Sequence, residues 1–143
     1  MVIADNNRHD IHKWMCNALK FDVAQTVTLG VLNETQKLIA GFSYFKKGQI
    51  CLITAYADSP NWCTPETLSE LLRVPFEALG CKIAKFETSN KNEKANRFCK
   101  GIGCVREGIL RYAHHDGTHQ VVWSLTRREI LNKGWYRYGK QRA

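Results

Sequence analysis

Apolar side chains recur at helical spacing in the first half of the chain and predict two helices there. In the first, residues 11, 14, 15, 18 and 19 form one apolar face, which predicts a helix over residues 7–20. The second should begin after Thr64, a favourable N-cap, with Pro65 at the first helical position. Gly80 should end this helix, and Pro75 should kink it because proline has no amide hydrogen to donate.

Strands are predicted where apolar residues alternate with polar ones or form short runs between turns. These segments are residues 27–31, 38–45, 50–57, 81–88, 105–111 and 121–125. In the first of them Val27, Leu29 and Val31 alternate, which predicts a strand with one buried face. Polar residues predict the turns, which are expected at 33–36, 46–49, 58–61 and 115–118.

A third helix is predicted within the segment 92–111, NEKANRFCKGIGCVREGILR, directly before a strand. Residues 95, 98, 99 and 102 share one helical face, and Gly101 and Gly103 supply the helix end. The whole chain then reads as helix, three strands, helix, strand, helix and two strands, with a helical turn at 127–132. An antiparallel meander that leads into βα units is typical of an α/β fold with a mixed sheet.

The length of 143 residues, without a linker or an internal repeat, predicts one domain over residues 1–143. No apolar run approaches the roughly 20 residues that span a membrane, and the N-terminus lacks the apolar core of a secretory signal. We therefore expect a cytoplasmic protein. Its six cysteines contain no CxxC pair, so we expect reduced thiols in the core, and neither a metal site nor a disulfide framework: Cys16, Cys51, Cys63, Cys81, Cys99 and Cys104.

The net charge of +8 favours anionic partners such as nucleic acid or an acidic protein surface. Charge is concentrated in the tail, residues 127–143, where Trp135, Tyr136 and Tyr138 lie between basic residues. Such a tail can stack bases and follow phosphates. Alternatively, it is a solvated terminal segment whose aromatic side chains pack back onto the domain.

The segment 92–111 resembles the acyl-CoA half of the GNAT acetyltransferases. In that family an Asn-x-x-(Ser/Ala) helix runs into a Gly-Phe-x-x-Glu-Gly-x-x-Arg strand. The element order is also similar to that fold, a mixed, mostly antiparallel sheet flanked by helices. Two further segments, 76–80 and 123–129, resemble the branch of the ribosomal-protein alanine N-acetyltransferases. The resemblance implies transfer of an acetyl group from acetyl-CoA, whose phosphates suit a basic protein, to an amine on a protein, a small molecule or a nucleobase.

The resemblance also implies where the cofactor binds. The family's glycine-rich pyrophosphate loop corresponds to Trp62, Cys63, Thr64, Glu66 and Thr67, a stretch without glycine. Helix N-terminal amides can still meet an anion there, although Pro65 offers none and an inward Glu66 carboxylate would repel it.

Further cofactor contacts are implied on either side of this stretch. Asn92, with Ala95 beside it, is implied to hydrogen-bond the pantetheine arm, and Asn90 is the alternative if the register differs. Asn92 also suits a helix N-cap. The backbone of three consecutive residues is implied to polarise the thioester carbonyl: Ala55, Tyr56 and Ala57.

Candidates for proton transfer are less specific. The family's general-acid tyrosine corresponds to Cys99, whose thiol could donate a proton or could simply pack in the core. Glu107 is a candidate base, or else an ion-pair partner of Arg106 or Arg111. Other candidate groups are Tyr56, Asp58, His114, His115 and His119.

Two functions remain open from the sequence. The intact segment 92–111 favours an acetyltransferase, whose acceptor would be selected by residues such as His9, Trp14 and Phe21. The missing loop glycines and the missing tyrosine favour a catalytically inactive GNAT-like module that binds nucleic acid or protein through its basic surface.

Overall fold

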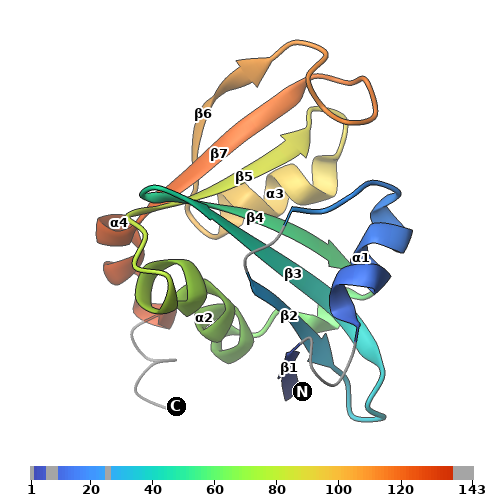
Figure 1. Ribbon diagram of the computed structural model, residues 1–143. Coiled ribbons are helices and arrows are strands. Elements are labelled where there is room, and N and C mark those ends of the chain that lie inside the picture. The colour runs from blue at the N-terminus through green and yellow to red at the C-terminus, as the bar shows by residue number, and fades with distance from the viewer. Residues whose placement is uncertain (1, 6–9, 25–26, 137–143) are drawn as a thin grey trace.

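A computed structural model describes residues 2–5, 10–24 and 27–136. Its centre is a seven-stranded sheet in the order β1-β2-β3-β4-β5-β7-β6 (Figure 1). Neighbouring strands run antiparallel except β4 and β5, which are parallel, so the sheet is mixed and mostly antiparallel as predicted. The strands are β1 (Val2–Asp5), β2 (Val27–Leu32), β3 (Leu38–Lys47), β4 (Ile50–Ala57), β5 (Ile83–Ser89), β6 (Val105–Leu110) and β7 (Gln120–Thr126).

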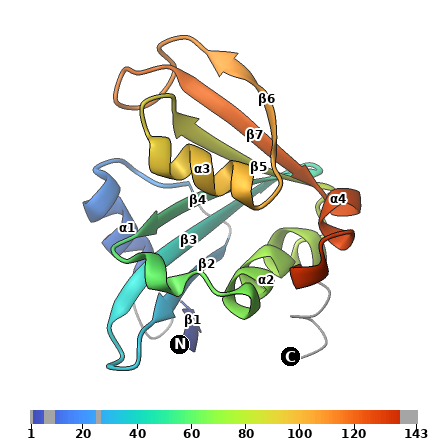
Figure 2. The same ribbon diagram turned by 180° about the vertical axis from the view of Figure 1, so that it is seen from behind.

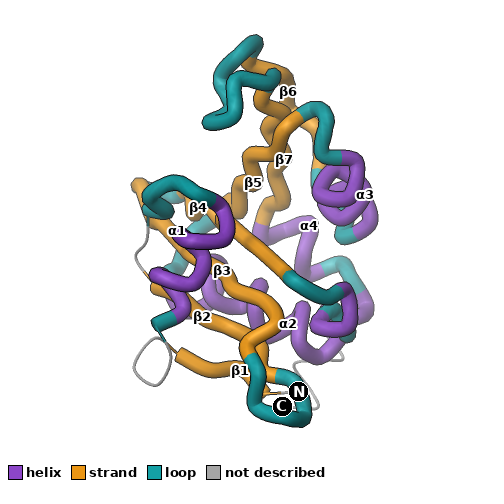
Figure 3. Tube along the Cα trace, turned by 90° about the vertical axis from the view of Figure 1, so that its right-hand side faces the viewer, coloured by secondary structure: helices purple, strands orange, loops and turns teal. Residues whose placement is uncertain are grey.

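Helices cover both faces of this sheet. Helix α1 lies on one face, and α2 and α3 lie on the other (Figure 3). The helical elements are α1 (Ile11–Leu19), the 3₁₀ turn η1 (Pro60–Trp62), α2 (Pro65–Arg73), the π-turn η2 (Val74–Ala78), α3 (Glu93–Gly101) and α4 (Arg127–Leu131). The prediction of one buried face for the strand at 27–31 was therefore wrong, because Thr28, Gly30 and Val31 are all buried.

The N-terminal region contains a strand that was not predicted. Strand β1, which pairs with β2, was missed because four residues are too few to show a period. Helix α1 begins at Ile11, because Asp10 is its N-cap and accepts a hydrogen bond from the Lys13 amide at 3.1 Å. His9 and the predicted helix start lie outside the described residues.

Helix α1 lies unusually close to the sheet because β3 carries a glycine beneath it. A Cβ atom at Gly41 would lie 2.7 Å from Cγ of Met15, closer than packed carbon atoms approach. Ile11 and Met15 are fully buried in this contact. The glycine inside a strand is thus explained by the close approach of a helix.

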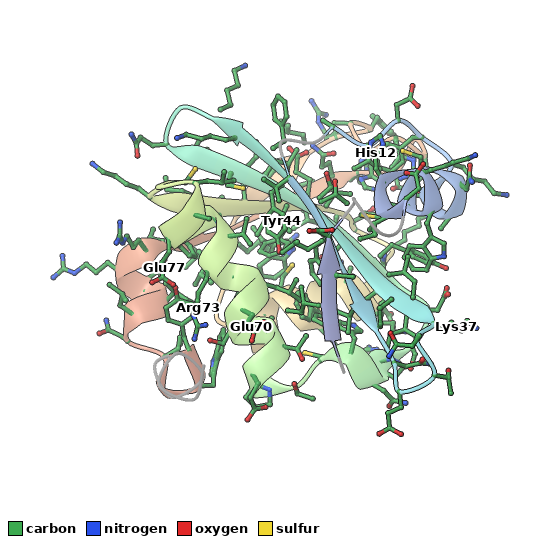
Figure 4. The ribbon with its side chains drawn as sticks, turned by 60° about the horizontal axis from the view of Figure 1, so that its bottom comes forward. His12, Lys37, Tyr44, Glu70, Arg73 and Glu77 are labelled. Carbon is green, nitrogen blue, oxygen red and sulfur yellow. The ribbon has the colours of Figure 1, made fainter. Side chains whose placement is uncertain are left out.

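Helix α2 begins as predicted, with Thr64 as its N-cap. The chain widens into the π-turn at Val74–Ala78, where Pro75 has no amide hydrogen to donate, so the predicted irregularity takes this form. The Cys81 amide still donates to the Pro75 carbonyl at 2.8 Å, so β5 begins only at Ile83. Tyr44 reaches from β3 to this layer and donates to the Leu71 carbonyl at 2.8 Å (Figure 4).

The chain after β7 packs back onto the domain as far as it is described. Helix α4 confirms the predicted helical turn, and Trp135 packs against the core. Tyr136 is 2% exposed and its hydroxyl donates to the Glu77 carboxylate at 3.1 Å. Burial raises the pKa of Tyr136 to about 12. For Trp135 and Tyr136 the structure therefore supports the alternative in which the aromatic side chains of the tail pack back onto the domain. Tyr138 and the last basic residues lie outside the described residues.

Candidate functional site

Strands β4 and β5 separate along their length. They pair from Ile50 and Ile83 as far as Ile53 and Phe86, and then their ends point apart (Figures 1 and 2). The second half of β4 therefore has a partner only on its β3 side. This divergence opens a gap in the middle of an otherwise continuous sheet.

The backbone of β4 directs hydrogen-bond donors into this gap. The Asp58 amide donates to the Ile39 carbonyl at 2.9 Å, so it points toward β3. Successive amides of a strand point to opposite sides, and the register between β3 and β4 is unbroken. The N–H groups of Ala55 and Ala57 therefore face the gap, as an electrophilic carbonyl would require.

Two adjoining cavities of about 380 and 370 Å³ fill the gap. Together they form one cleft, because they share part of their lining: Leu19, Ala55, Asn92, Ala95 and Phe98. One end of the cleft lies at the Thr64 turn, which we define as residues 60–67. The other lies at the histidine loop, defined as residues 111–119 between β6 and β7.

Aromatic side chains form the wall of the cleft at the Thr64 turn. The ring of Trp62 lies 4.9 Å from that of Phe42 and 5.7 Å from that of Phe98, measured between centroids. Phe98 in turn lies 6.3 Å from Phe86 on β5. This cluster ties η1 and α3 to β3 and β5. Cys63, at the rim, has a pKa raised by partial burial, which makes its thiol less reactive.

The backbone of the Thr64 turn is largely engaged in internal hydrogen bonds. The Cys63 amide donates to the Pro60 carbonyl at 3.2 Å, and the Thr64 amide donates to that of Trp62 at 3.1 Å. The Thr67 amide donates to the Thr64 hydroxyl at 3.2 Å. The expectation that Thr67 offers a free amide to an anion was therefore wrong, because the N-cap already uses it. Glu66 follows Pro65 in the first turn of α2.

Asn92 begins α3 and lines both cavities. Its side-chain oxygen accepts from the Ala95 amide at 3.1 Å, which confirms the N-cap interpretation, and Ala95 lines the cleft beside it. Asn90 instead binds the histidine loop, accepting from the His119 amide at 3.2 Å.

A polar residue that sequence reasoning missed fixes α3 against the sheet. The side-chain oxygen of Asn96 accepts from the Thr88 hydroxyl at 2.6 Å and from the Trp123 indole at 3.0 Å. Its amide group donates to the Ser89 carbonyl at 3.0 Å. An asparagine in the middle of a helix is a weak signal that such a partner exists.

The histidine loop is held in place by hydrogen bonds to the end of β5. The Asn90 amide donates to the His119 carbonyl at 2.9 Å, and the hydroxyls of Ser89 and Thr118 lie 2.6 Å apart. Within the loop the His114 amide donates to the Thr118 carbonyl at 3.1 Å. The loop is thus a fixed wall of the cleft.

His114 and His115 face the cleft from this loop. The His115 ring stacks on Phe21, with centroids 4.4 Å apart, and lies 4.4 Å from the ring of His114. The Nδ1 atom of His114 is buried and has no hydrogen-bond partner among the described residues. An unpaired buried polar atom costs about 1–3 kcal/mol unless a ligand satisfies it. His119 is engaged, because its Nδ1 accepts from the Tyr112 amide at 3.0 Å.

Asp116 stays ionised beside these rings. Hydrogen bonds from the Thr118 hydroxyl and amide, and then the nearby His114 and His115, hold the pKa of the Asp116 carboxyl below its usual value. Its charge lies next to any proton that either imidazole accepts.

The remaining predicted residues lie in different places. Cys99 lines the cleft but is 1% exposed, and its hydrogen bond with Cys104, together with burial, raises the pKa of its thiol far above the usual value. Tyr56 lines the end near the Thr64 turn, where its hydroxyl donates to Asp58 at 2.8 Å, the main cause of its raised pKa.

Glu107 is not among the residues of the cleft. It lies on β6, at the far edge of the sheet, and accepts a hydrogen bond from the Ser124 hydroxyl. Among the described residues it makes no ion pair with Arg106 or Arg111. The structure therefore does not bring this candidate base to the gap.

Within the described residues, no helix is both long and apolar enough to cross a membrane. No protein-family model matches the sequence, and no curated protein matches it. Solved structures do match the fold. A protein of T. thermophilus, described provisionally as an acetyltransferase, is similar with a TM-score of 0.64 and 25% identity. The match covers 81% of this chain and 65% of that one, so this chain spans slightly under two thirds of that protein's length.

More distant structures have the same fold. A GCN5-related N-acetyltransferase from Brucella melitensis matches with a TM-score of 0.66 and 17% identity, over 94% of this chain and 64% of that one. Mutant forms of the spermidine/spermine N-acetyltransferase SpeG from Vibrio cholerae match with a TM-score of 0.67 and 15% identity, over 87% and 80%. The chain has the fold of the GNAT acetyltransferases. These matches do not confirm the expected placement in the branch of the ribosomal-protein alanine N-acetyltransferases.

Proposed function

We propose that this protein is an acetyl-CoA-dependent N-acetyltransferase that acts on a primary amine. The observation that carries the proposal is the cleft between β4 and β5, into which β4 directs the N–H groups of Ala55 and Ala57. The GNAT fold supports the same reaction class. Placement in the ribosomal-protein alanine N-acetyltransferase branch remains a proposal that rests on the segments 76–80 and 123–129 alone.

Some parts of acetyl-CoA fit the residues of the cleft better than others. The aromatic wall around Trp62 and Phe98 suits the apolar parts of an acyl-pantetheine arm, and Asn92 lies beside it with polar groups. Lys91 and Lys94 line the cavities and can meet phosphate charge. The engaged amides of the Thr64 turn fit a pyrophosphate less well. We therefore expect the lysines to replace part of the missing glycine-rich loop.

In this proposal the chain contributes position and a fixed hydrogen-bond donor. The N–H group of Ala55, in the part of the lining common to both cavities, polarises the acetyl carbonyl, and the cleft aligns the amine with it. Cys99, the sequence candidate for protonating the leaving thiolate, is a poor donor for this step, because its hydrogen bond with Cys104 and its burial raise the pKa of the thiol and hold the proton there. Tyr56 and Asp58 lie at the opposite end from the histidine loop and are expected to contact the pantetheine rather than to act as bases.

Calorimetry with acetyl-CoA and with CoA tests the cofactor, and release of free CoA thiol tests transfer to a panel of amines. We expect saturable binding with a dissociation constant in the range of about 1 μM to 1 mM. The variant Ala55→Pro removes the donor from the gap without removing a β3–β4 hydrogen bond, and should lower kcat by about 10²-fold. Ala55→Ser retains the N–H group and is the control. A protein that binds neither acetyl-CoA nor CoA contradicts the proposal.

A non-catalytic module that binds nucleic acid is the second candidate. It is favoured by a basic groove between α3 and the β6–β7 hairpin, lined by Arg97, Lys100 and Arg106. Fluorescence anisotropy with single-stranded RNA at two salt concentrations tests it. Salt-sensitive RNA binding in a protein that does not bind CoA would favour this second candidate over the enzyme.

A further inference from the structure

We propose that His114 is the general base that takes a proton from the acceptor amine, with Asp116 as its charge partner. This inference rests on the acetyltransferase function proposed above and assigns a catalytic residue to it. A protein amine is largely protonated at neutral pH, so its lone pair must be freed before attack. His114 supplies an imidazole in the cleft, on a wall fixed by the rest of the loop.

The three histidines of the loop are not equivalent. His119 accepts a hydrogen bond from the Tyr112 amide, so its ring has a structural role. His115 is exposed and stacked on Phe21, at the mouth of the cleft. Only His114, among these three, combines a place in the cleft with a buried ring nitrogen that lacks a partner.

Charged and titratable groups around His114 come from several elements. Its own loop contributes His115 and the Asp116 carboxylate. The other such groups that line the same cavity are Glu87 on β5, Lys91 before α3 and Cys99 on α3. A carboxylate near an imidazole can stabilise the cation that forms when the ring accepts a proton. Asp116, which lines the same cavity and stays ionised, is placed for this role.

His114 takes one proton from the ammonium group of the acceptor and becomes a cation. The freed nitrogen lone pair forms the new C–N bond to the acetyl carbon as the C–S bond breaks, and the bonding electrons leave on sulfur. A second proton from the nitrogen passes to that sulfur, giving the amide and free thiol. Bulk water then takes the proton from His114.

The test is the kinetics of His114→Gln, which retains a polar side chain of similar size but no base. With the best primary amine of the panel we expect kcat to fall about 10²-fold. With hydroxylamine, which is already neutral at pH 7, the loss should be much smaller. The wild-type rate should fall as pH drops through the range in which imidazoles protonate, and the variant should lose this limb. Added imidazole should partly restore the kcat of His114→Ala. His119→Gln is the matched control from the same loop.

Equal losses with the amine and with hydroxylamine would overturn the inference, since they indicate a structural effect. An unchanged acidic limb in His114→Gln would overturn it as well. If the wild-type protein acetylates no amine, it is the proposed function that fails, and this inference fails with it.

Discussion

The two ends of the cleft differ in how completely their polar groups are hydrogen-bonded. At the Thr64 turn, aromatic side chains pack together, and the amides of Cys63, Thr64 and Thr67 donate hydrogen bonds within the turn. At the histidine loop, the backbone is also held by hydrogen bonds, but the buried Nδ1 of His114, a residue that lines the cleft, has no partner among the described residues. A closed hydrogen-bond network indicates a structural role, and an open one indicates a place for a ligand.

The two ends of the cleft are also expected to differ in function. Because the Thr64 turn has few free donors, we expect it to contribute stability and an apolar wall rather than strong phosphate binding. The histidine loop carries the titratable groups and should affect turnover more than folding. Variants at each end of the cleft test whether the two ends differ in this way.

The largest effect is expected from Trp62→Ala. Trp62 is 7% exposed and contacts Phe42 and Phe98, so its loss should lower the free energy of unfolding by about 3 kcal/mol. At the other end, Phe21→Ala loses a half-exposed stack on His115 and should cost only about 1 kcal/mol. Urea denaturation measures both. Similar losses would mean that the two ends contribute equally to the core.

An intermediate effect is expected from Thr64→Ala, which removes the N-cap of α2. It should lower the free energy of unfolding by about 1 kcal/mol, while Thr64→Ser retains the hydroxyl and should differ little. CoA affinity, measured by calorimetry, should not fall, because the Thr67 amide becomes available to an anion. Weaker CoA binding in a folded Thr64→Ala protein would show that the hydroxyl itself holds the ligand.

The smallest effect is expected from acidification of the histidine loop. The folded-state pKa of Asp116 is lowered, so its contribution to loop order is present above the ordinary carboxyl value of about 3.9 and is lost as pH falls through the lowered value. The amide resonance of Thr118 should therefore shift below about pH 4. In Asp116→Asn this shift should vanish. A Thr118 resonance that titrates equally in both proteins would assign the change to another group.

Several features could be predicted from the sequence because their causes are local. Thr64 and Asn92 cap their helices through side chains that reach only three residues ahead. The change from helix to strand between positions 92 and 110 depends on a periodic apolar face and on Gly103, whose φ of +98° suits glycine. Strand β1 escaped prediction because it is short and is stabilised only by pairing with β2.

The amino-acid sequence by itself determined the helices with caps, most of the strands and the order from which the fold class follows, since side-chain period and capping act within a few residues. Only the tertiary structure decided which polar groups share the cleft. Sequence reasoning selected Glu107 as the candidate base and gave His114 only as a further candidate, yet the structure places Glu107 at a distant edge of the sheet and His114 in the lining of the cleft. That outcome depends on contacts between segments far apart in the chain, such as Ser89 with Thr118 and Phe21 with His115, which no local pattern encodes.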